Sequence, residues 1–232
     1  MGKVSGWSPK KVMRLCAKAI IWFIGISIAW VALYRFVPPP VTAPMISAWA
    51  SGRSVDRDWM ALSEMDPDMA RAAIGAEDSR FCQHWGFDLE AMKKAFDRNR
   101  EGHKLRGGST ISQQTAKNAF LWQGRSYLRK GLEAWFTALI ELLWGKHRIM
   151  EVYLNNAETG IATFGANAGA QRYFHHDASR LTRTEAARIA AVLPLPKKRK
   201  AISPGGFTRR YGNSIEKRIG LVQRQGLDSC VR

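Results

Sequence analysis

An unbroken apolar run near the N-terminus constrains this chain more than any other feature of its sequence. Residues 19–37 (AIIWFIGISIAWVALYRFV) contain a single charged side chain, Arg35. As a helix rising about 1.5 Å per residue, the run reaches about 28 Å, roughly the thickness of one hydrocarbon core. A cleaved signal peptide would have a shorter apolar region followed by small residues, whereas this run leads into Pro38-Pro39-Pro40. The sequence therefore predicts an uncleaved transmembrane anchor.

The charges beside the run predict its orientation. Residues 1–18 contain five Lys or Arg side chains and no acidic one. Positively charged flanks stay in the cytoplasm, so we expect the residues after the anchor to lie outside it. The whole chain of 232 residues has a net charge of +17, which favours an anionic partner such as a membrane surface, a phosphate-bearing substrate or a nucleic acid. Export of the domain argues against nucleic acid.

Beyond the anchor, the sequence predicts one mainly α-helical domain. We expect a cytoplasmic basic tail over 1–18, the anchor over 19–37, a membrane-proximal linker over 38–64 and the domain over 65–232. Within the linker, residues 41–62 show no clear period and predict a loop or short hairpin on the membrane surface. Capping residues and apolar spacing predict helices over 66–79, 88–102, 110–124, 126–143, 146–155, 165–174, 182–193 and 212–225.

The cysteines give no sign of cross-linking. Cys16, Cys82 and Cys230 are odd in number and far apart in the sequence. This arrangement predicts neither a disulfide framework nor a thiolate metal site.

The first cluster of residues suited to chemistry is Glu77-Asp78, at the end of the first helix predicted after the linker. Adjacent carboxylates are unfavourable at a helix C-terminus, and such costly charges are frequent where a general base needs a tuned pKa. A surface ion pair with Arg71 or Arg80 is the alternative.

The second cluster is GGSTISQQTAKN, residues 107–118. Glycines followed by hydroxyls at a helix start predict an anion-binding end with free N–H groups. Gln113, Gln114 and Lys117 share one helix face, which suits a diphosphate or sugar hydroxyls. No lysine follows the glycines at the spacing of a nucleotide-binding P-loop. An ordinary capped helix with a solvated polar face is the alternative.

The third cluster is RKGLE, in which Arg129 and Lys130 flank Glu133 at i,i+4 and i,i+3. A helix-surface ion pair has the same spacing. The fourth is RIMEVYLNNAETG, residues 148–160, whose apolar members predict core positions and whose glycine predicts a turn or a close backbone approach.

Taken together, the clusters resemble the peptidoglycan glycosyltransferase family. GAEDSRFCQHWGFD, GGSTISQQTAKN, RKGLE and RIMEVYLNNAETG occur in that family's order and spacing, followed by LTRTEAARIAAVLPLPKKRKAISP as a fifth motif. The likeness extends from about residue 65 to about residue 205. About 25 residues follow, too few for the transpeptidase domain of bifunctional relatives, so the resemblance is to the single-activity form.

The resemblance implies a lysozyme-like, two-lobed helical domain on the outer face of the cytoplasmic (inner) membrane. The implied activity joins lipid II disaccharides by β-1,4 bonds, with inversion and release of polyprenyl diphosphate, for cell wall synthesis. The implied partners are lipid II, the growing lipid-linked strand, membrane lipids and other wall-synthesis or division proteins. Mg or Mn could assist the diphosphate, but the sequence contains no dedicated ligand cage.

The resemblance also implies residue roles. Glu77 matches the catalytic base on the acceptor, and Glu133 matches a second glutamate that supports the donor side. Lys117, Arg125 and Lys130 stand where family members hold the donor diphosphate. The remaining expected substrate-site residues are Ser109, Thr110, Gln113 and Gln114 in the donor site, Asp78, His84 and Gly86 around the acidic turn, and Lys94, Asn118 and Arg129.

Two positions depart from the family pattern. Lys94 stands where arginine is commoner, and it loses bidentate reach toward a diphosphate. His175-His176 replaces a commoner Gly-Lys, and we expect these histidines at the surface.

Three other functions stay open from the sequence: a glycan hydrolase of the same fold class, a basic nucleic-acid binder and an inactive scaffold for wall-synthesis proteins. Incubation with lipid II separates all three from a polymerase, because only the polymerase lengthens glycan strands.

Overall fold

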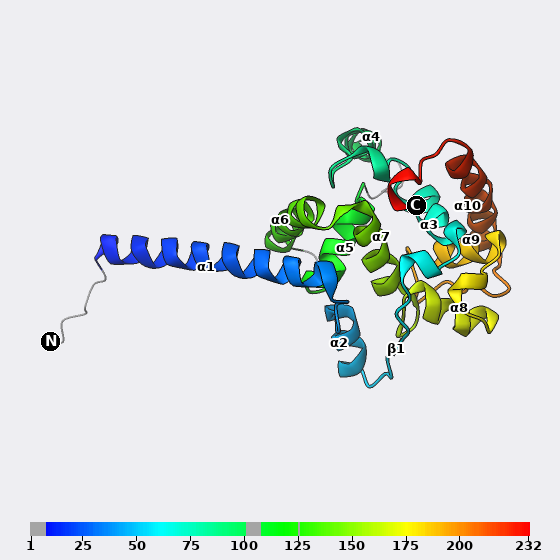
Figure 1. The fold of residues 1–232 in the computed structure, drawn as a ribbon, viewed down its shortest axis with the longest axis horizontal. Coiled ribbons are helices and arrows are strands. Elements are labelled where there is room, and N and C mark those ends of the chain that lie inside the picture. Colours follow the sequence, from blue (N-terminus) through cyan, green and yellow to red (C-terminus); the bar gives the residue numbers. More distant parts are fainter. Residues whose placement is uncertain (1–7, 101–107, 125) are drawn as a thin grey trace.

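The computed structural model describes residues 8–100, 108–124 and 126–232. A long N-terminal helix, α1 (Pro9–Phe36), extends from a body of shorter helices (Figure 1). The mainly helical fold class expected from the sequence is confirmed.

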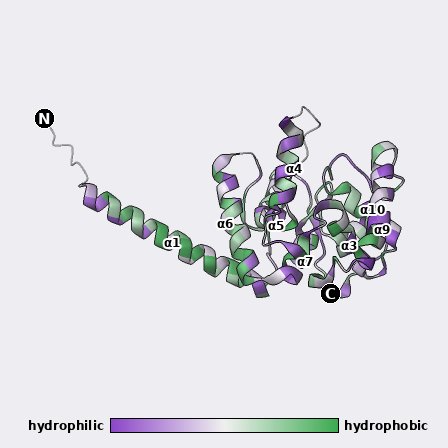
Figure 2. Ribbon diagram, turned by 90° about the horizontal axis from the view of Figure 1, so that it is seen from above, coloured by the Kyte–Doolittle hydropathy of each residue, from purple (hydrophilic) through white to green (hydrophobic). Residues whose placement is uncertain are grey.

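Helix α1 is long and apolar enough to cross a membrane. It begins ten residues before the predicted anchor, because the basic segment from Pro9 onward continues the helix. Most of its side chains are exposed, and Figure 2 shows hydrophobic residues along much of its length. Ser27, Val31 and Tyr34 are buried, since this part of α1 packs against the body.

The expected loop or hairpin over residues 41–62 is wrong. The segment forms α2 (Ala43–Ala50) and β1 (Asp56–Arg57), followed by the 3₁₀ turn η1 (Leu62–Glu64). Met45 and Ala48, three residues apart on α2, are buried against Ala162 and Phe164. Eight residues are too few to show a helical period clearly in the sequence, and the burying partners lie more than a hundred positions away.

A small sheet lies beside α2. Strand β1 pairs in parallel with β3 (Thr163–Phe164), and β3 pairs antiparallel with β2 (Glu158–Gly160).

The helices of the body follow the predicted order. They are α3 (Pro67–Glu77), α4 (Leu89–Arg100), α5 (Ile111–Phe120), α6 (Tyr127–Leu143), α7 (Gly145–Asn156), α8 (Ala166–Phe174), α9 (Arg183–Val192) and α10 (Gly206–Arg224), with the 3₁₀ turns η2 (Phe81–Gln83), η3 (Ala178–Arg180) and η4 (Ser229–Val231). The predicted caps are present: Asp66 accepts from the Asp68 N–H, and Thr110 and Thr182 form capping boxes. Helix α10 begins six residues before the predicted Gly212, whereas α5 ends four residues before the predicted end.

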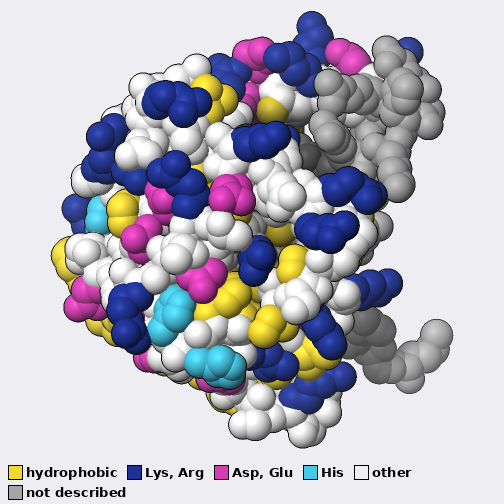
Figure 3. Space-filling model, turned by 90° about the vertical axis from the view of Figure 1, so that its right-hand side faces the viewer, with side chains coloured by type: hydrophobic (Ala, Val, Ile, Leu, Met, Phe, Trp, Pro, Cys, Tyr) yellow, Lys and Arg dark blue, Asp and Glu magenta, His cyan; other side chains and the backbone are white. Residues whose placement is uncertain are grey.

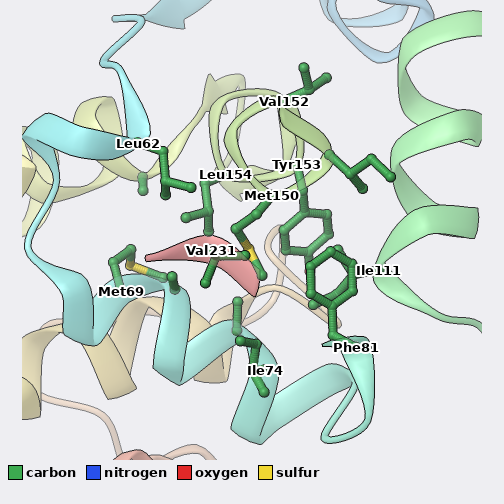
Figure 4. Packing of buried hydrophobic residues seen from close by; sticks show 14 of the residues in the cluster. Leu62, Met69, Ile74, Phe81, Ile111, Met150, Val152, Tyr153, Leu154 and Val231 are labelled. Atoms are coloured by element: carbon green, nitrogen blue, oxygen red, sulfur yellow. The ribbon is translucent and has the colours of Figure 1, made fainter. Parts of the chain in front are cut away.

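The main core is formed by α3, α5, α6, α7, α9 and α10. Figure 4 shows Met69 and Ile74 from α3 facing Met150 and Leu154 from α7, with Val231 from the C-terminal turn η4 between them. The last residues of the chain are therefore part of the core.

The expectation that the cysteines form no cross-link is wrong. Cys82 in η2 and Cys230 in η4 form a disulfide with a Cα–Cα distance of 5.5 Å across 148 positions of sequence. Spacing could not reveal this pair, because it depends on the return of the C-terminus to the core beside η2. Cys16 is a free, exposed cysteine on α1.

Candidate active site

Glu77 is the last residue of α3, and its carboxylate lies partly buried where α3 meets α5. Gln114 Nε2 on α5 donates a hydrogen bond of 2.9 Å to Glu77 Oε2. Burial raises the pKa of Glu77, and the neighbouring Asp78 charge adds to this. The Gln114 bond and the charges of Arg199 and Lys117 lower the pKa in part. A carboxylate with a raised pKa is a stronger proton acceptor when ionised.

Asp78 ties the acidic turn to the start of α5. Its buried carboxylate lies 3.0 Å from His84 Nε2 and accepts the Ile111 N–H at 3.0 Å. The Gln113 N–H bonds to Thr110 Oγ1 at 3.1 Å. The sequence predicted free N–H groups for an external anion at this helix end, and that is wrong for these two donors, since the protein's own side chains already bind them.

Gly86 allows the turn to lie close against α6. Its φ of +81° is in the region that favours glycine, and a Cβ here would meet Thr137 Cγ2 at 2.6 Å. Its carbonyl accepts from Thr110 Oγ1 at 2.6 Å. Thr110 also caps α5 and Gln113 Oε1 accepts the Thr110 N–H, so the Thr110 hydroxyl and the Gln113 side-chain oxygen already bind protein partners.

Glu133 lies buried on α6 between two cations. Arg129 Nη1 donates to it at 2.6 Å, and the Lys130 ammonium forms an ion pair with its other oxygen. The i,i+4 and i,i+3 pairing read from RKGLE is thus confirmed. The alternative of an exposed surface pair does not apply to Glu133, whose side chain is only 4% exposed.

Lys117 lies in the last turn of α5, close to these charges. Burial lowers the pKa of Lys117, and the charges of Arg129 and Lys130 lower it further, whereas those of Glu133 and Glu77 raise it. Lys117 therefore lies near the start of α6. The sequence had predicted the anion site at the start of α5 instead.

Three adjoining cavities surround these groups. The acidic cavity includes Glu77, Asp78, Asp88, Lys94, Ser109 and Thr110. The cationic cavity includes Ser109, Gln113, Gln114, Lys117, Gln123, Gly124, Arg129, Lys130 and Glu133. The third, beside α2, includes Ser47, Gln114, Lys117, Asn118, Tyr153, Asn156 and Lys197. Shared lining residues connect the three, so the cleft brings together most of the side chains expected from the sequence.

Not all expected residues lie among these buried groups. Lys94 lines the acidic cavity, but its side chain is exposed on α4 and pairs with Glu90 at 2.5 Å. His84 Nε2 lies 3.0 Å from Asp78, which lines the acidic cavity. His175 and His176, which were expected at the surface rather than in the site, follow α8; His175 is exposed, and half-buried His176 lies 3.4 Å from Glu185. Arg125 lies outside the described residues.

The donor set does not fit a resident metal ion. Within the described ranges, no three His, Cys, Asp or Glu side chains gather as ligands. In the cationic cavity, Glu133 is already bound by Arg129 and Lys130.

Sequence reasoning missed Arg199 as a neighbour of Glu77. Its guanidinium stacks on the rings of Phe207 and Tyr211, and its charge lowers the pKa of Glu77. The run Lys197-Lys198-Arg199-Lys200 was the available signal, but nothing in its spacing indicates which cation faces the carboxylate.

The comparisons with known proteins agree with this geometry. The family model described as Transglycosylase matches residues 44–219. A biosynthetic peptidoglycan transglycosylase of Caulobacter vibrioides is 55% identical over 201 residues, covering 87% of this chain and 88% of the relative. Proteins of the same name from Pseudomonas aeruginosa (48% identical, 90% and 93% covered) and Pseudomonas syringae pv. syringae (45% identical, 96% and 99% covered) are also similar. With its paired glutamates and cations at one cleft, the chain belongs to the transglycosylase family and is a peptidoglycan glycosyltransferase.

Proposed function

We propose that the cleft joins lipid II disaccharides into glycan strands, with the acceptor in the acidic cavity and the donor diphosphate in the cationic cavity. The observation that carries this assignment is the position of Glu77. It lines the acidic cavity and is bonded to Gln114, which also lines the cationic one. A proton acceptor therefore lies beside a group of cations, as a sugar transfer from a diphosphate requires.

Glu77 acts as the base in this proposal. The acceptor 4-hydroxyl gives its proton to the Glu77 carboxylate as its oxygen bonds to the anomeric carbon of the donor. The bond between that carbon and the diphosphate breaks, and the electron pair leaves with the lipid diphosphate. Attack from the face opposite the leaving group inverts the anomeric carbon, so base and cations must lie on different sides of it. The two separate cavities, one with Glu77 and one with the cations, support this arrangement.

Lys117 is the main partner of the leaving group. Arg129 and Lys130 both form ion pairs with Glu133. The negative charge of Glu133 therefore offsets much of the positive charge of these two side chains. Lys117 has no ion pair of this kind among the described residues, so it can respond most to charge that grows on the diphosphate. Glu133 then supports the donor side by orienting Arg129 and Lys130.

The same proposal includes the location: the inner membrane, with the N-terminus in the cytoplasm and residues 38–232 outside it. Residues 1–18 contain five Lys or Arg side chains and no acidic side chain, which supports this orientation. The Cys82–Cys230 disulfide supports it independently, because disulfides persist in oxidising compartments. A C-terminal reporter should be active only outside the cytoplasm. Other wall-synthesis or division proteins are proposed as membrane partners.

The test is polymerisation of lipid II by the purified full chain. We expect the wild type to lengthen glycan strands and Glu77→Gln to do so about 10²–10⁴-fold more slowly, because the amide cannot accept the proton. Glu216→Gln is the matched control, since Glu216 lies on α10 and contacts Thr184. Near-normal synthesis by Glu77→Gln would refute the base assignment. Release of soluble disaccharides by the wild type would favour a hydrolase.

A further inference from the structure

A fourth cavity, of about 640 Å³, lies where the segment between α9 and α10 passes α8. None of the described residues that line it is acidic, and its cations are Arg172, Lys197, Lys198, Arg199 and Lys200. We call this cavity the lysine pocket. Figure 3 shows a different arrangement on the side of α10, where Asp and Glu side chains lie among the Lys and Arg. The lysine pocket is therefore an unusually one-sided concentration of charge.

The two guanidinium groups of the pocket are held by uncharged partners. Arg172 Nη1 donates to Thr163 Oγ1 at 2.7 Å. Arg199 Nη1 donates to the Ala191 carbonyl at 2.8 Å, and its guanidinium stacks on two aromatic rings of α10. Because these partners carry no charge, they orient the guanidinium groups without neutralising them.

The lysines of the pocket also keep most of their charge available. Lys197 lies 3.9 Å from Glu158. Lys198 and Lys200 are exposed and form no ion pair within the described parts of the chain. Cations gathered around one cavity repel one another, and a single carboxylate is too few to offset them. The pocket therefore suits a ligand that carries more than one negative charge.

The lysine pocket continues from the donor side of the cleft. Pro196 and Lys197 line both this pocket and the third cavity, beside α2. Lys117 lines both the third cavity and the cationic cavity. A ligand whose diphosphate is bound at Lys117 can therefore extend through the third cavity to the lysine pocket.

The third cavity contains a buried donor that is free to bind such a ligand. Asn156 is 2% exposed, and its Oδ1 accepts from Arg57 Nη2 at 3.2 Å, which sets the orientation of the amide. Its Nδ2 has no hydrogen-bond partner within the described residues. Because a buried N–H group without a partner is costly, its position in the cavity lining points to a ligand that supplies an acceptor oxygen. Peptide carbonyls are acceptors of this kind.

We propose that the lysine pocket binds the acidic stem peptide of the lipid II molecule that acts as donor. In lipid II, this peptide is joined to the same sugar that carries the diphosphate, so a donor bound at Lys117 presents its peptide from beside that position. The carboxylates of the peptide are complementary to the cations of the pocket, and its carbonyls are acceptors for Asn156 Nδ2. The inference rests on the proposed function of the cationic cavity.

The experiment compares two donors that share sugars, diphosphate and lipid, one with its acidic peptide and one with the carboxyl groups of that peptide amidated. Each carries a label and a blocked 4-hydroxyl, so that it can act only as donor. Transfer of the label to ordinary lipid II is measured with the full chain in detergent. For Lys198→Gln/Lys200→Gln, we expect the ratio of kcat/KM values (acidic over amidated donor) to fall about fivefold, because two solvent-exposed charge contacts are lost.

Lys217→Gln/Arg224→Gln is the matched control. It removes the same charge from exposed positions of α10, so any effect of net charge alone would appear in it as well. Its ratio should equal that of the wild type.

An unchanged ratio in Lys198→Gln/Lys200→Gln would overturn the inference. An equal loss with both donors would also overturn it, because the lysines would then act on a part of the substrate that both donors share, such as the diphosphate, or on the fold. Failure of the proposed function would look different, because the wild type would then transfer the label from neither donor.

Discussion

Burial shifts the pKa values of Glu77 and Lys117 toward each other, and this has a consequence for the pH dependence of the reaction. The base must be ionised and the lysine protonated. Because burial raises the pKa of Glu77, the acid limb of the kcat/KM profile should lie above 4.5, the ordinary glutamate value. Because burial lowers the pKa of Lys117, the alkaline limb should lie below 10.5. A pH series with lipid II as substrate measures both limbs.

The variant Gln114→Met tests whether Glu77 is the group whose ionisation produces the acid limb. The hydrogen bond from Gln114 stabilises the carboxylate and lowers the pKa of Glu77, so its loss should raise that pKa and move the acid limb to higher pH. Gln83→Met is the control, because Gln83 is exposed on η2. An acid limb that stays in place in Gln114→Met would assign it to another group.

The charge of Lys117 can be tested by substitution. Lys117→Met keeps the aliphatic stem but removes the cation, and we expect a loss of about 2–4 kcal/mol of transition-state stabilisation, roughly 10²–10³ in rate. Lys117→Arg should recover only part, since a planar guanidinium differs from a point charge in a fitted site. The melting temperature should not fall, because the variant removes a charge that burial disfavours. Unchanged turnover would show that Lys117 has no role in the reaction.

The sequence predicted which charged residues gather in the candidate site better than it predicted their partners. Glu77, Lys117 and Glu133 stand in short motifs whose composition indicates charge chemistry. The bond from the Ile111 N–H to Asp78 joins positions 33 apart, and no local pattern could predict it. Because of this bond, the start of α5 binds the carboxylate of Asp78 instead of an external anion.

At the scale of elements, local signals predicted the helices whose start is set by a side-chain cap. Thr110 and Thr182 cap α5 and α9 at the expected positions, because the capping box lies within four residues. Helix α10 follows Gly205, which makes no side-chain cap, and its first turns lacked a start signal. Helix α2 and the turn η4 form because distant residues bury them, so sequence periodicity could not predict them.

The disulfide joins two elements that the sequence did not connect. Cys82→Ser/Cys230→Ser should lower the free energy of unfolding by about 2–5 kcal/mol, because the bond closes a loop of 148 positions and holds η4 in the core. Thermal unfolding in detergent, with and without a dithiol reductant, measures this. The reductant should lower the melting temperature of the wild type and leave that of the double variant unchanged. Cys16→Ser is the control, and an equal effect there would contradict the role of the disulfide.

At the scale of the whole molecule, α1 is long and apolar enough to cross a membrane, and its C-terminal part also packs into the body. Trp30 and Tyr34 of α1 contact Phe120, and Phe120 stacks on Phe136 with a ring-centroid distance of 4.7 Å. Arg148 donates to the Tyr34 carbonyl at 2.9 Å. The sequence predicted the apolar run and its length, but it could not show that the C-terminal part of the run packs against α5, α6 and α7.

Deletion of residues 1–37 tests how far the body depends on α1. The main core contains few α1 side chains, Val31 and Tyr34, so the truncated domain should still fold and unfold cooperatively. It should melt at a lower temperature, because Phe120, Phe136 and Trp144 lose their cover and become exposed apolar surface. The same surface should make it depend on detergent for solubility. Turnover of lipid II should fall, since the cationic cavity loses its fixed position beside the bilayer. Circular dichroism melting and polymerisation on one preparation measure both effects, and loss of cooperative unfolding would show that α1 is required for the fold.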